Sequence, residues 1–159
     1  MNQKSLSKWL KVILIGIALS GLMLYGWILP VIADAIAYYF PEWAHCYTPW
    51  MILMWITGIP CYIVLFLCWK VAVNIGRDRT FSFENGKLFR LIGKVAVGDS
   101  ILFFAANVVF LFLNLNHPFI LIGSCVVVFL GTAIAVASKV MAQLVDNAAS
   151  MKEENDLTI

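Results

Sequence analysis

Residues 70–94, KVAVNIGRDRTFSFENGKLFRLIGK, join two long apolar runs and form the most basic segment of the sequence. Six of the eleven Lys and Arg residues lie here: Lys70, Arg77, Arg79, Lys87, Arg90 and Lys94. A basic segment between two apolar runs is typical of a cytoplasmic loop that joins two transmembrane helices. The segment therefore predicts that the runs on both sides of it cross a membrane.

The composition of the whole chain leads to the same interpretation. Of its 159 residues, 62% are hydrophobic and 13% are charged, whereas a soluble domain usually carries about 25% charged residues. A water-soluble core of this size cannot bury so large an apolar excess. The composition therefore predicts an integral membrane protein that contacts the lipid bilayer.

Four apolar runs are long enough to cross a bilayer, which takes about 20 helical residues, each rising about 1.5 Å. They cover residues 12–33, 50–73, 91–115 and 119–138. We expect a single membrane domain, residues 1–159, in which residues 139–159 form a cytoplasmic helical extension and tail. The predicted fold class is all-α, an integral membrane four-helix bundle with both termini in the cytoplasm.

Two proline residues interrupt the first two runs. Pro30 has no N–H to donate to the carbonyl of Gly26, which predicts a kink or a helix end there. Pro60 likewise leaves the carbonyl of Ile56 without its donor, which predicts a bend near the middle of the second run.

The distribution of charge predicts the orientation of the helices. Residues 34–49 and 114–118 contain no Lys or Arg. Aromatic residues gather in the first of these segments, as is typical of the headgroup layer. We therefore expect an external loop there, with a short helix at residues 34–40 that Pro41 ends, and a tight external turn in the second segment. All eleven Lys and Arg residues then share one side with both termini, and the positive-inside rule assigns that side to the cytoplasm.

The third run has a recognisable helix start. Ser82 is a candidate N-cap, and Glu84 falls in the first turn, where the helix dipole favours an anion. Phe81 and its apolar neighbours stand in a basic setting, which suits an interfacial segment that leads into the next span.

Asp99 is the only carboxylate well inside an expected span. An unpaired carboxylate at the bilayer centre costs about 2.5–3.5 kcal/mol. We expect Asp99 to lie shallow on the cytoplasmic side and to pair with Lys70 of the neighbouring helix, with Lys94 as the alternative. Together with Asn107, this pair is either a structural link between helices or a proton or cation site.

The fourth helix is expected to continue past the membrane. Its later apolar residues follow the 4-3-4-3 spacing of a coiled-coil seam: Ala137, Met141, Leu144, Ala148 and Met151. We expect the helix to run to about residue 152. Two uses of the stripe remain open, packing on the 70–94 loop or docking of a partner.

Cysteine and histidine residues predict no site chemistry. The four Cys form no C-x-x-C motif or Cys/His cluster, and His45 and His117 both fall on the external side without a nucleophile at matching depth. We therefore expect no metal, no cofactor and no enzyme activity.

Short motifs resemble a known family. Residues 81–85 (FSFEN), 88–93 (LFRLIG) and 154–159 (ENDLTI) are similar to the corresponding segments of a family called domain of unknown function 2975. The resemblance implies a small bacterial membrane protein with four spans, located in the cytoplasmic membrane, and no assigned activity. It also implies a working link to an Xre-type helix-turn-helix regulator, since genes for family members often lie beside the gene for such a regulator.

Two functions follow as hypotheses. In the first, a non-enzymatic regulatory or anchoring protein holds a cytosolic partner, such as a helix-turn-helix transcription regulator. The proposed partner face is formed by the loop, the fourth helix and the tail: Arg77, Arg79, Phe81, Glu84, Asn85, Arg90, Met141, Leu144, Leu157 and Ile159. The apolar residues of the tail suit strand addition to another protein.

In the second hypothesis, the chain is a small transporter, channel or immunity protein, and homo-oligomers line a polar path around Asp99. Direct binding of nucleic acid is not expected, because topology and anionic lipid already account for the basic loop.

Overall fold

The computed structural model describes the backbone of residues 2–157 and the side chains of residues 2–155. Within this part of the chain, four helical segments are long and apolar enough to cross a membrane. They are Gln3–Tyr39, Pro41–Gly76, Phe83–Phe112 and Pro118–Asn155. The prediction of four long apolar helices is confirmed. Each helix begins before the run expected from hydropathy, and the third ends three residues earlier than expected, at Phe112.

The first segment consists of α1 (Gln3–Met23), the π-helical turn η1 (Leu24–Ile28) and α2 (Leu29–Tyr39). Pro30 lies in the first turn of α2, where its missing N–H is tolerated. The kink or helix end expected near Gly26 is therefore a π-turn instead. An added residue in the turn before a proline is a common way to accommodate its ring without ending the helix.

Residues 34–49, where we expected an external loop with a short helix ended by Pro41, are helical over most of their length. Because nothing interrupts the helix before Pro41, α2 continues to Tyr39. A short 3₁₀ helix, η2 (Pro41–Cys46), then leads directly into α3 (Tyr47–Gly76). Proline is accepted in a first helical turn, so Pro49 does not delay α3. Pro60 lies inside α3, which continues past it as an α-helix.

The remaining helices begin and end largely as the sequence indicates. The Asn85 N–H donates to Ser82 Oγ over 3.4 Å, so Ser82 caps α4 (Phe83–Phe112) and Glu84 lies in its first turn. Asn114 adopts a φ of 56°, a left-handed conformation that Asn tolerates, and the chain reverses there. Helix α5 (Pro118–Leu157) has 40 residues and runs somewhat further than expected.

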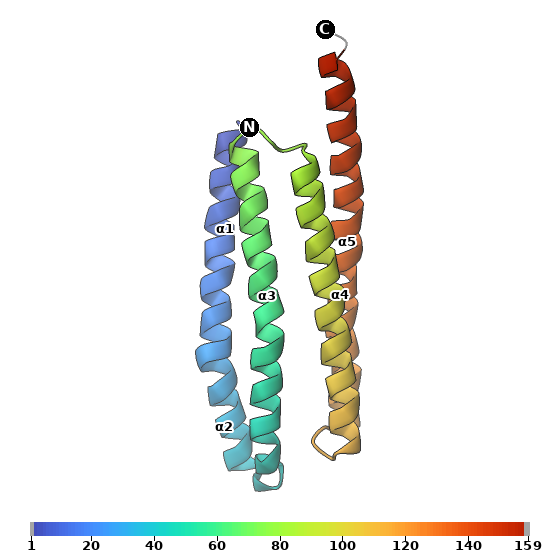
Figure 1. Ribbon diagram of the computed structural model, residues 1–159. Helices are drawn as coiled ribbons and strands as arrows, with labels where there is room; N and C mark the ends of the chain where they lie inside the picture. Colours follow the sequence, from blue (N-terminus) through green and yellow to red (C-terminus); the bar gives the residue numbers. More distant parts are fainter. Residues whose placement is uncertain (1, 158–159) are drawn as a thin grey trace.

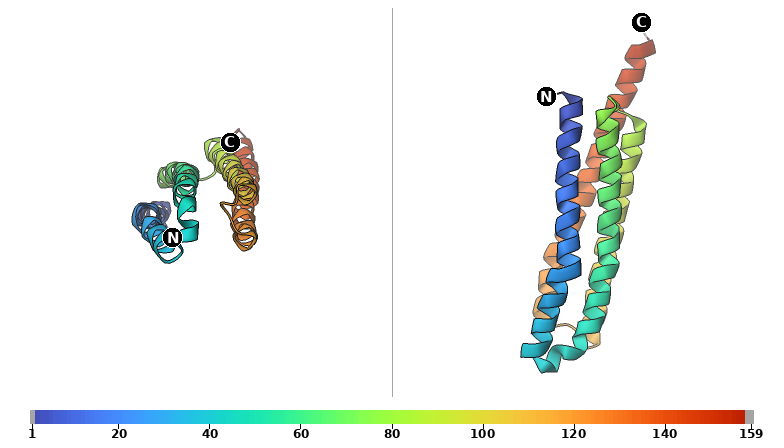
Figure 2. Two further views of the ribbon diagram at one scale, coloured as in Figure 1. Left: turned by 90° about the horizontal axis from the view of Figure 1, so that it is seen from below. Right: turned by 90° about the vertical axis from the view of Figure 1, so that its left-hand side faces the viewer.

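The helices follow one another in a row (Figure 1; Figure 2, left). Helix α1 packs on α3, α3 on α4 and α4 on α5, and within the described residues α1 makes no contact with α4 or α5. We expected a four-helix bundle, and the structure arranges the four described helices as an open row in which the first and last helices do not meet. In lipid, no hydrophobic effect forces apolar helix faces together, so an unclosed arrangement carries little penalty.

Both chain ends lie at the same end of the molecule as the α3–α4 loop (Figure 1). We call this the basic end, because all eleven Lys and Arg residues belong to the helix halves and the loop that form it. We call the opposite end, where η2 and the α4–α5 turn lie, the aromatic end. Helix α5 projects past the other helices at the basic end (Figure 1).

Candidate functional site

Helix α5 carries two apolar stripes with different environments. The first faces α4 at 3-4-3-4 spacing and is buried: Ala135, Ser138, Ala142, Val145 and Ala149. The second is the stripe predicted from the sequence, and it is largely exposed: Ala137, Met141, Leu144 and Met151, with Ala148 intermediate. Met141 is 44% exposed and Leu144 is 56% exposed. The stripe predicted from the sequence therefore does not pack within the chain. The first stripe makes the contact with α4 instead.

The α3–α4 loop is held by a buried pair of Asn residues. Asn74 Nδ2 donates to Asn85 Oδ1 over 2.9 Å, and Asn85 Nδ2 donates to the carbonyls of Arg79 and Thr80 over 3.0 Å and 2.9 Å. Asn85 is only 1% exposed. We expected Asn85 on the partner face, but its side-chain amide binds Asn74 and the loop backbone instead. No motif in the sequence indicated that Asn74 would be its partner.

Arg90 was also expected on the partner face, and the structure pairs it with Asp146 of α5 in a salt bridge. Gly86 makes room for this pair, because a Cβ at that position would overlap the Asp146 carboxylate. The contact was not foreseen, although Asp146 is the only acidic residue between Asp99 and Glu153. Arg90 therefore links α4 to α5 and is only partly available to a partner.

The other residues of the predicted partner face remain accessible at the basic end. Arg77, Arg79, Phe81 and Glu84 are all exposed. Phe81 is notable because 56% of it is exposed beside charged neighbours. The side chain of Leu157 and the whole of Ile159 lie outside the described residues.

Asp99 lies deeper than expected. It forms no salt bridge with Lys70 or Lys94, and Lys70 Nζ lies 4.8 Å from the centroid of the Phe66 ring instead. The Asp99 carboxylate interacts electrostatically with Cys61 and Tyr25. Cys61 precedes Lys70 by two and a half turns of α3, about 13 Å along the helix axis. The register of α3 against α4 therefore places Asp99 beside Cys61 and away from Lys70, and the predicted Asp99–Lys70 pair is wrong.

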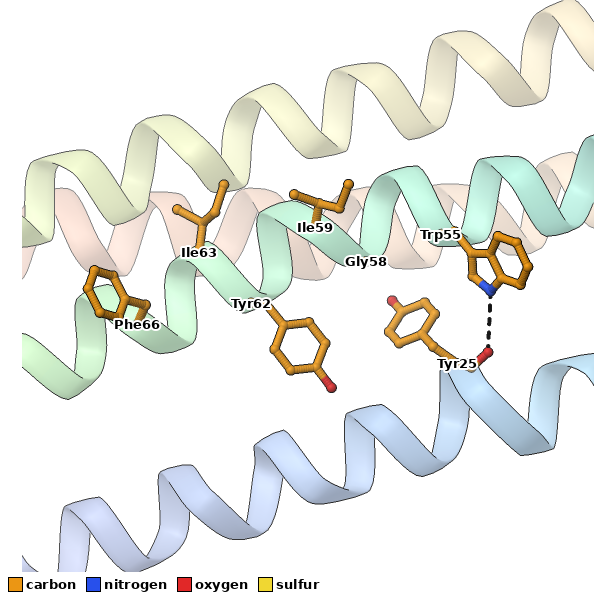
Figure 3. A pocket seen from close by; sticks show the side chains of 7 residues that line it. All are labelled: Tyr25, Trp55, Gly58, Ile59, Tyr62, Ile63 and Phe66. Carbon is orange, nitrogen blue, oxygen red and sulfur yellow. Dashed lines mark hydrogen bonds between the residues drawn. The ribbon is translucent and has the colours of Figure 1, made fainter.

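A groove of about 570 Å³ lies beside this polar group, between α1 and α3. Figure 3 shows the Tyr25 and Tyr62 rings in the space between the two helices, with aliphatic side chains along α3. Trp55 Nε1 donates to the Tyr25 carbonyl over 3.4 Å, and the Tyr62 hydroxyl donates to the Ala18 carbonyl over 2.9 Å. The lining of this groove is almost wholly apolar, as is typical of a lipid-facing surface.

One oxygen of Asp99, Oδ1, is buried and has no hydrogen-bond partner in the structure. Such an atom is costly inside a protein. The polar set predicted from the sequence is nevertheless dispersed. Asn107 is fully buried near the aromatic end, donates to the Phe103 carbonyl over 2.9 Å and accepts from Asn116 Nδ2 over 3.1 Å. It fixes the α4–α5 turn and does not extend a polar path from Asp99.

The two His residues both lie at the aromatic end. His45 Nε2 lies 3.4 Å from the Asn114 carbonyl, and the centroids of the His117 and Trp43 rings are 6.4 Å apart. Within the part of the chain that the structure describes, no three His, Cys, Asp or Glu side chains are arranged to hold a metal ion.

Comparisons with known proteins identify the family. The model of a family described as "protein of unknown function (DUF2975)" matches residues 31–159. The chain is 30% identical to the uncharacterized membrane protein YoaS of Bacillus subtilis (strain 168) over 161 residues, which cover 100% of both proteins. No solved structure matches the chain significantly. With a full-length relative and a family match over most of its length, the chain belongs to the DUF2975 family and is a multi-pass membrane protein with four candidate spans.

Proposed function

We propose that this protein is a non-enzymatic membrane anchor that holds a cytosolic partner at its basic end. The observation that carries this proposal is the environment of α5. The helix uses one stripe to pack on α4 and keeps a second apolar stripe, Met141, Leu144 and Met151, exposed. Met141 and Leu144 lie at the level of the first turns of α4, where Gly86 meets Asp146, and Met151 lies further toward the end of α5. An apolar stripe at the spacing of a coiled-coil seam suits the groove or helix of another protein.

The proposal includes an orientation. All eleven Lys and Arg residues gather at the basic end, so the positive-inside rule would place that end and both termini in the cytoplasm. Residues 34–49 and 114–118, without Lys or Arg, would then face the outside. A cytosolic partner could reach the loop and the end of α5 together.

The chemistry of the face suggests the kind of partner. Methionine side chains adapt to differently shaped apolar surfaces, while the exposed Arg77 and Arg79 favour acidic groups at the rim of the contact. A partner with an apolar helix flanked by acidic residues fits both features. The family resemblance suggests the helix-turn-helix regulator encoded beside such genes as the first candidate to test.

The experiment is a pull-down of that regulator by the detergent-purified full-length protein. Leu144→Glu places a charge in the exposed stripe and should reduce recovery at least tenfold, because a charge is costly to bury in an apolar contact. Gln143→Glu adds the same charge to an exposed position outside both stripes and should bind like the unmodified protein. Equal recovery with both variants would refute the proposal.

A second function is favoured by one observation, the unpartnered Asp99 Oδ1 inside the membrane-spanning region. In a proton or cation carrier, this carboxylate would take up and release the transported ion, and copies of the chain would complete the path. Liposomes that contain the protein should then lose flux with Asp99→Asn. Flux unchanged by this substitution would exclude that role.

A further inference from the structure

A second cavity, of about 580 Å³, lies at the aromatic end. Its walls come from α2, η2, the start of α3 and the start of α5, so both helical hairpins contribute to it. The volume is that of a typical small-molecule site. The residues that matter for its chemistry are Ala33, Trp43, Tyr47, Trp50, His117 and Phe119.

Contacts within the protein hold these walls in place. Trp50 Nε1 donates to the Leu115 carbonyl over 2.8 Å, and the Trp50 ring lies edge-on to Phe110 with 5.5 Å between the centroids. The His45 ring meets the Asn114 carbonyl beside them. The two hairpins are thus joined at the aromatic end, and the cavity is formed before any ligand arrives.

Two neighbouring rings in the lining of this cavity, Trp43 and His117, carry hydrogen-bond donors. His117 Nδ1 accepts from the Phe119 N–H over 3.2 Å, so the neutral ring carries its proton on Nε2 and offers it as a donor. The indole N–H of Trp43 makes no hydrogen bond to any residue that the structure describes. Because the ring centroids are 6.4 Å apart, one small acceptor group can lie within reach of both donors.

The charges around the cavity exclude an anionic ligand. Asp34 interacts with the hydroxyl of Tyr47 in the cavity wall, and Glu42 lies in η2. No Lys or Arg occurs in residues 12–69 or 95–138 to balance these acids. An anionic head group would be repelled. The groups that Trp43 and His117 offer are donors, which call for an acceptor on the ligand.

We propose that this cavity binds one uncharged, drug-sized lipophile whose ester or ketone oxygen accepts hydrogen bonds from Trp43 and His117. The apolar body of the ligand fills the space between α2 and α5, and it arrives from the bilayer. A two-chain membrane lipid is too large for the volume. This site lies at the opposite end from the proposed partner face and does not depend on it.

The probe is methyl dibromostearate, an uncharged ester whose bromine atoms quench tryptophan fluorescence on contact. The full-length protein in detergent micelles should show saturable quenching, and Trp43→Phe should remove the largest part of the signal. The dibromostearate anion and bromohexadecane, which lacks an acceptor, should bind at least fivefold more weakly. Phosphatidylcholine with brominated chains should give only unsaturable quenching.

Matched variants test the location. Ala33→Trp fills the cavity and should abolish saturation, whereas Ala35→Trp, on an exposed part of α2 outside the lining, should not. His117→Ala should weaken binding of the ester about fivefold through the lost hydrogen bond. Saturable quenching that survives Ala33→Trp, a preference for the anion, or saturation by the phospholipid would overturn the proposal.

Discussion

The two hairpins of this molecule are packed in different ways. In α4–α5, Gly86, Gly93 and Ser100 recur every seven residues and face Asp146, Ala135 and Gly131. In α1–α3, small residues meet only near the basic end, where Gly76 faces Ser7. Further along, a Cβ on Gly21 would lie 2.8 Å from the Tyr62 hydroxyl and one on Gly58 would lie 3.3 Å from the Tyr25 ring. Small residues let two backbones approach closely, whereas rings hold helices apart. The difference explains why a groove opens between α1 and α3.

Of the substitutions that test this comparison, Gly93→Leu should reduce the free energy of unfolding most. A Cβ there lies 3.2 Å from the Ala135 carbonyl oxygen, and a backbone atom cannot move aside as a side chain can. We expect a loss of about 1–3 kcal/mol or more in the free energy of unfolding, measured by denaturation in detergent micelles. Gly98→Leu, on the same helix with nothing within 4 Å, is the control and should cost much less.

Asn85→Ala tests the connection between the hairpins. The substitution removes hydrogen bonds to Asn74 and to two loop carbonyls and leaves the buried Asn74 amide without this partner. We expect a loss of about 1–3 kcal/mol, together with faster proteolysis of the loop. An unchanged proteolysis rate would mean that the loop is held in some other way.

In the α1–α3 hairpin, Tyr62→Phe should have a smaller effect. It removes one hydrogen bond, from the hydroxyl to the Ala18 carbonyl, and keeps the ring. The expected loss is about 0.5–1.5 kcal/mol by the same denaturation assay. The control Tyr38→Phe, at a ring that is 79% exposed, should leave the free energy of unfolding unchanged. If Tyr62→Phe also left it unchanged, the ring alone would hold Tyr62 against α1.

The smallest effect is expected for Arg90→Ala. Its salt bridge with Asp146 joins side chains that are 45% and 24% exposed, and such pairs contribute about 0–1 kcal/mol. The loss should shrink further at high salt, and Lys87→Ala serves as the unpaired control. A loss above 2 kcal/mol would mean that this pair, and not the small-residue seam, holds α5 on α4.

Much of the fold could be predicted from the sequence, because lipid imposes simple rules. The long apolar runs predicted the four helices, and Ser82 predicted the start of α4. The register between helices could not be predicted, since it depends on side-chain shape across the contact. For this reason Asp99 was paired with Lys70, and Asn85 and Arg90 were assigned to a surface although both make contacts within the protein.

The stripe on α5 shows the same limit in another form. Spacing correctly indicated an apolar seam at Met141 and Leu144, but the same helix carries a second seam at nearly the same spacing through Ala142 and Val145. The small residues of the second seam give a weaker hydropathy signal, although they make the closer contact. Periodicity therefore located the exposed stripe, and only the structure showed that it is unused within the chain.

The most direct test of the proposed function is photo-crosslinking in intact membranes. A photoreactive residue is placed at each position from 140 to 151 in turn, and crosslinks to the helix-turn-helix regulator are counted. The account predicts that crosslinks to the regulator are most frequent at Met141, Leu144 and Met151. At Ala142, Val145 and Ala149 it predicts crosslinks within the chain, to α4. Crosslinks to the regulator that are absent, or that show no helical period along α5, would contradict it.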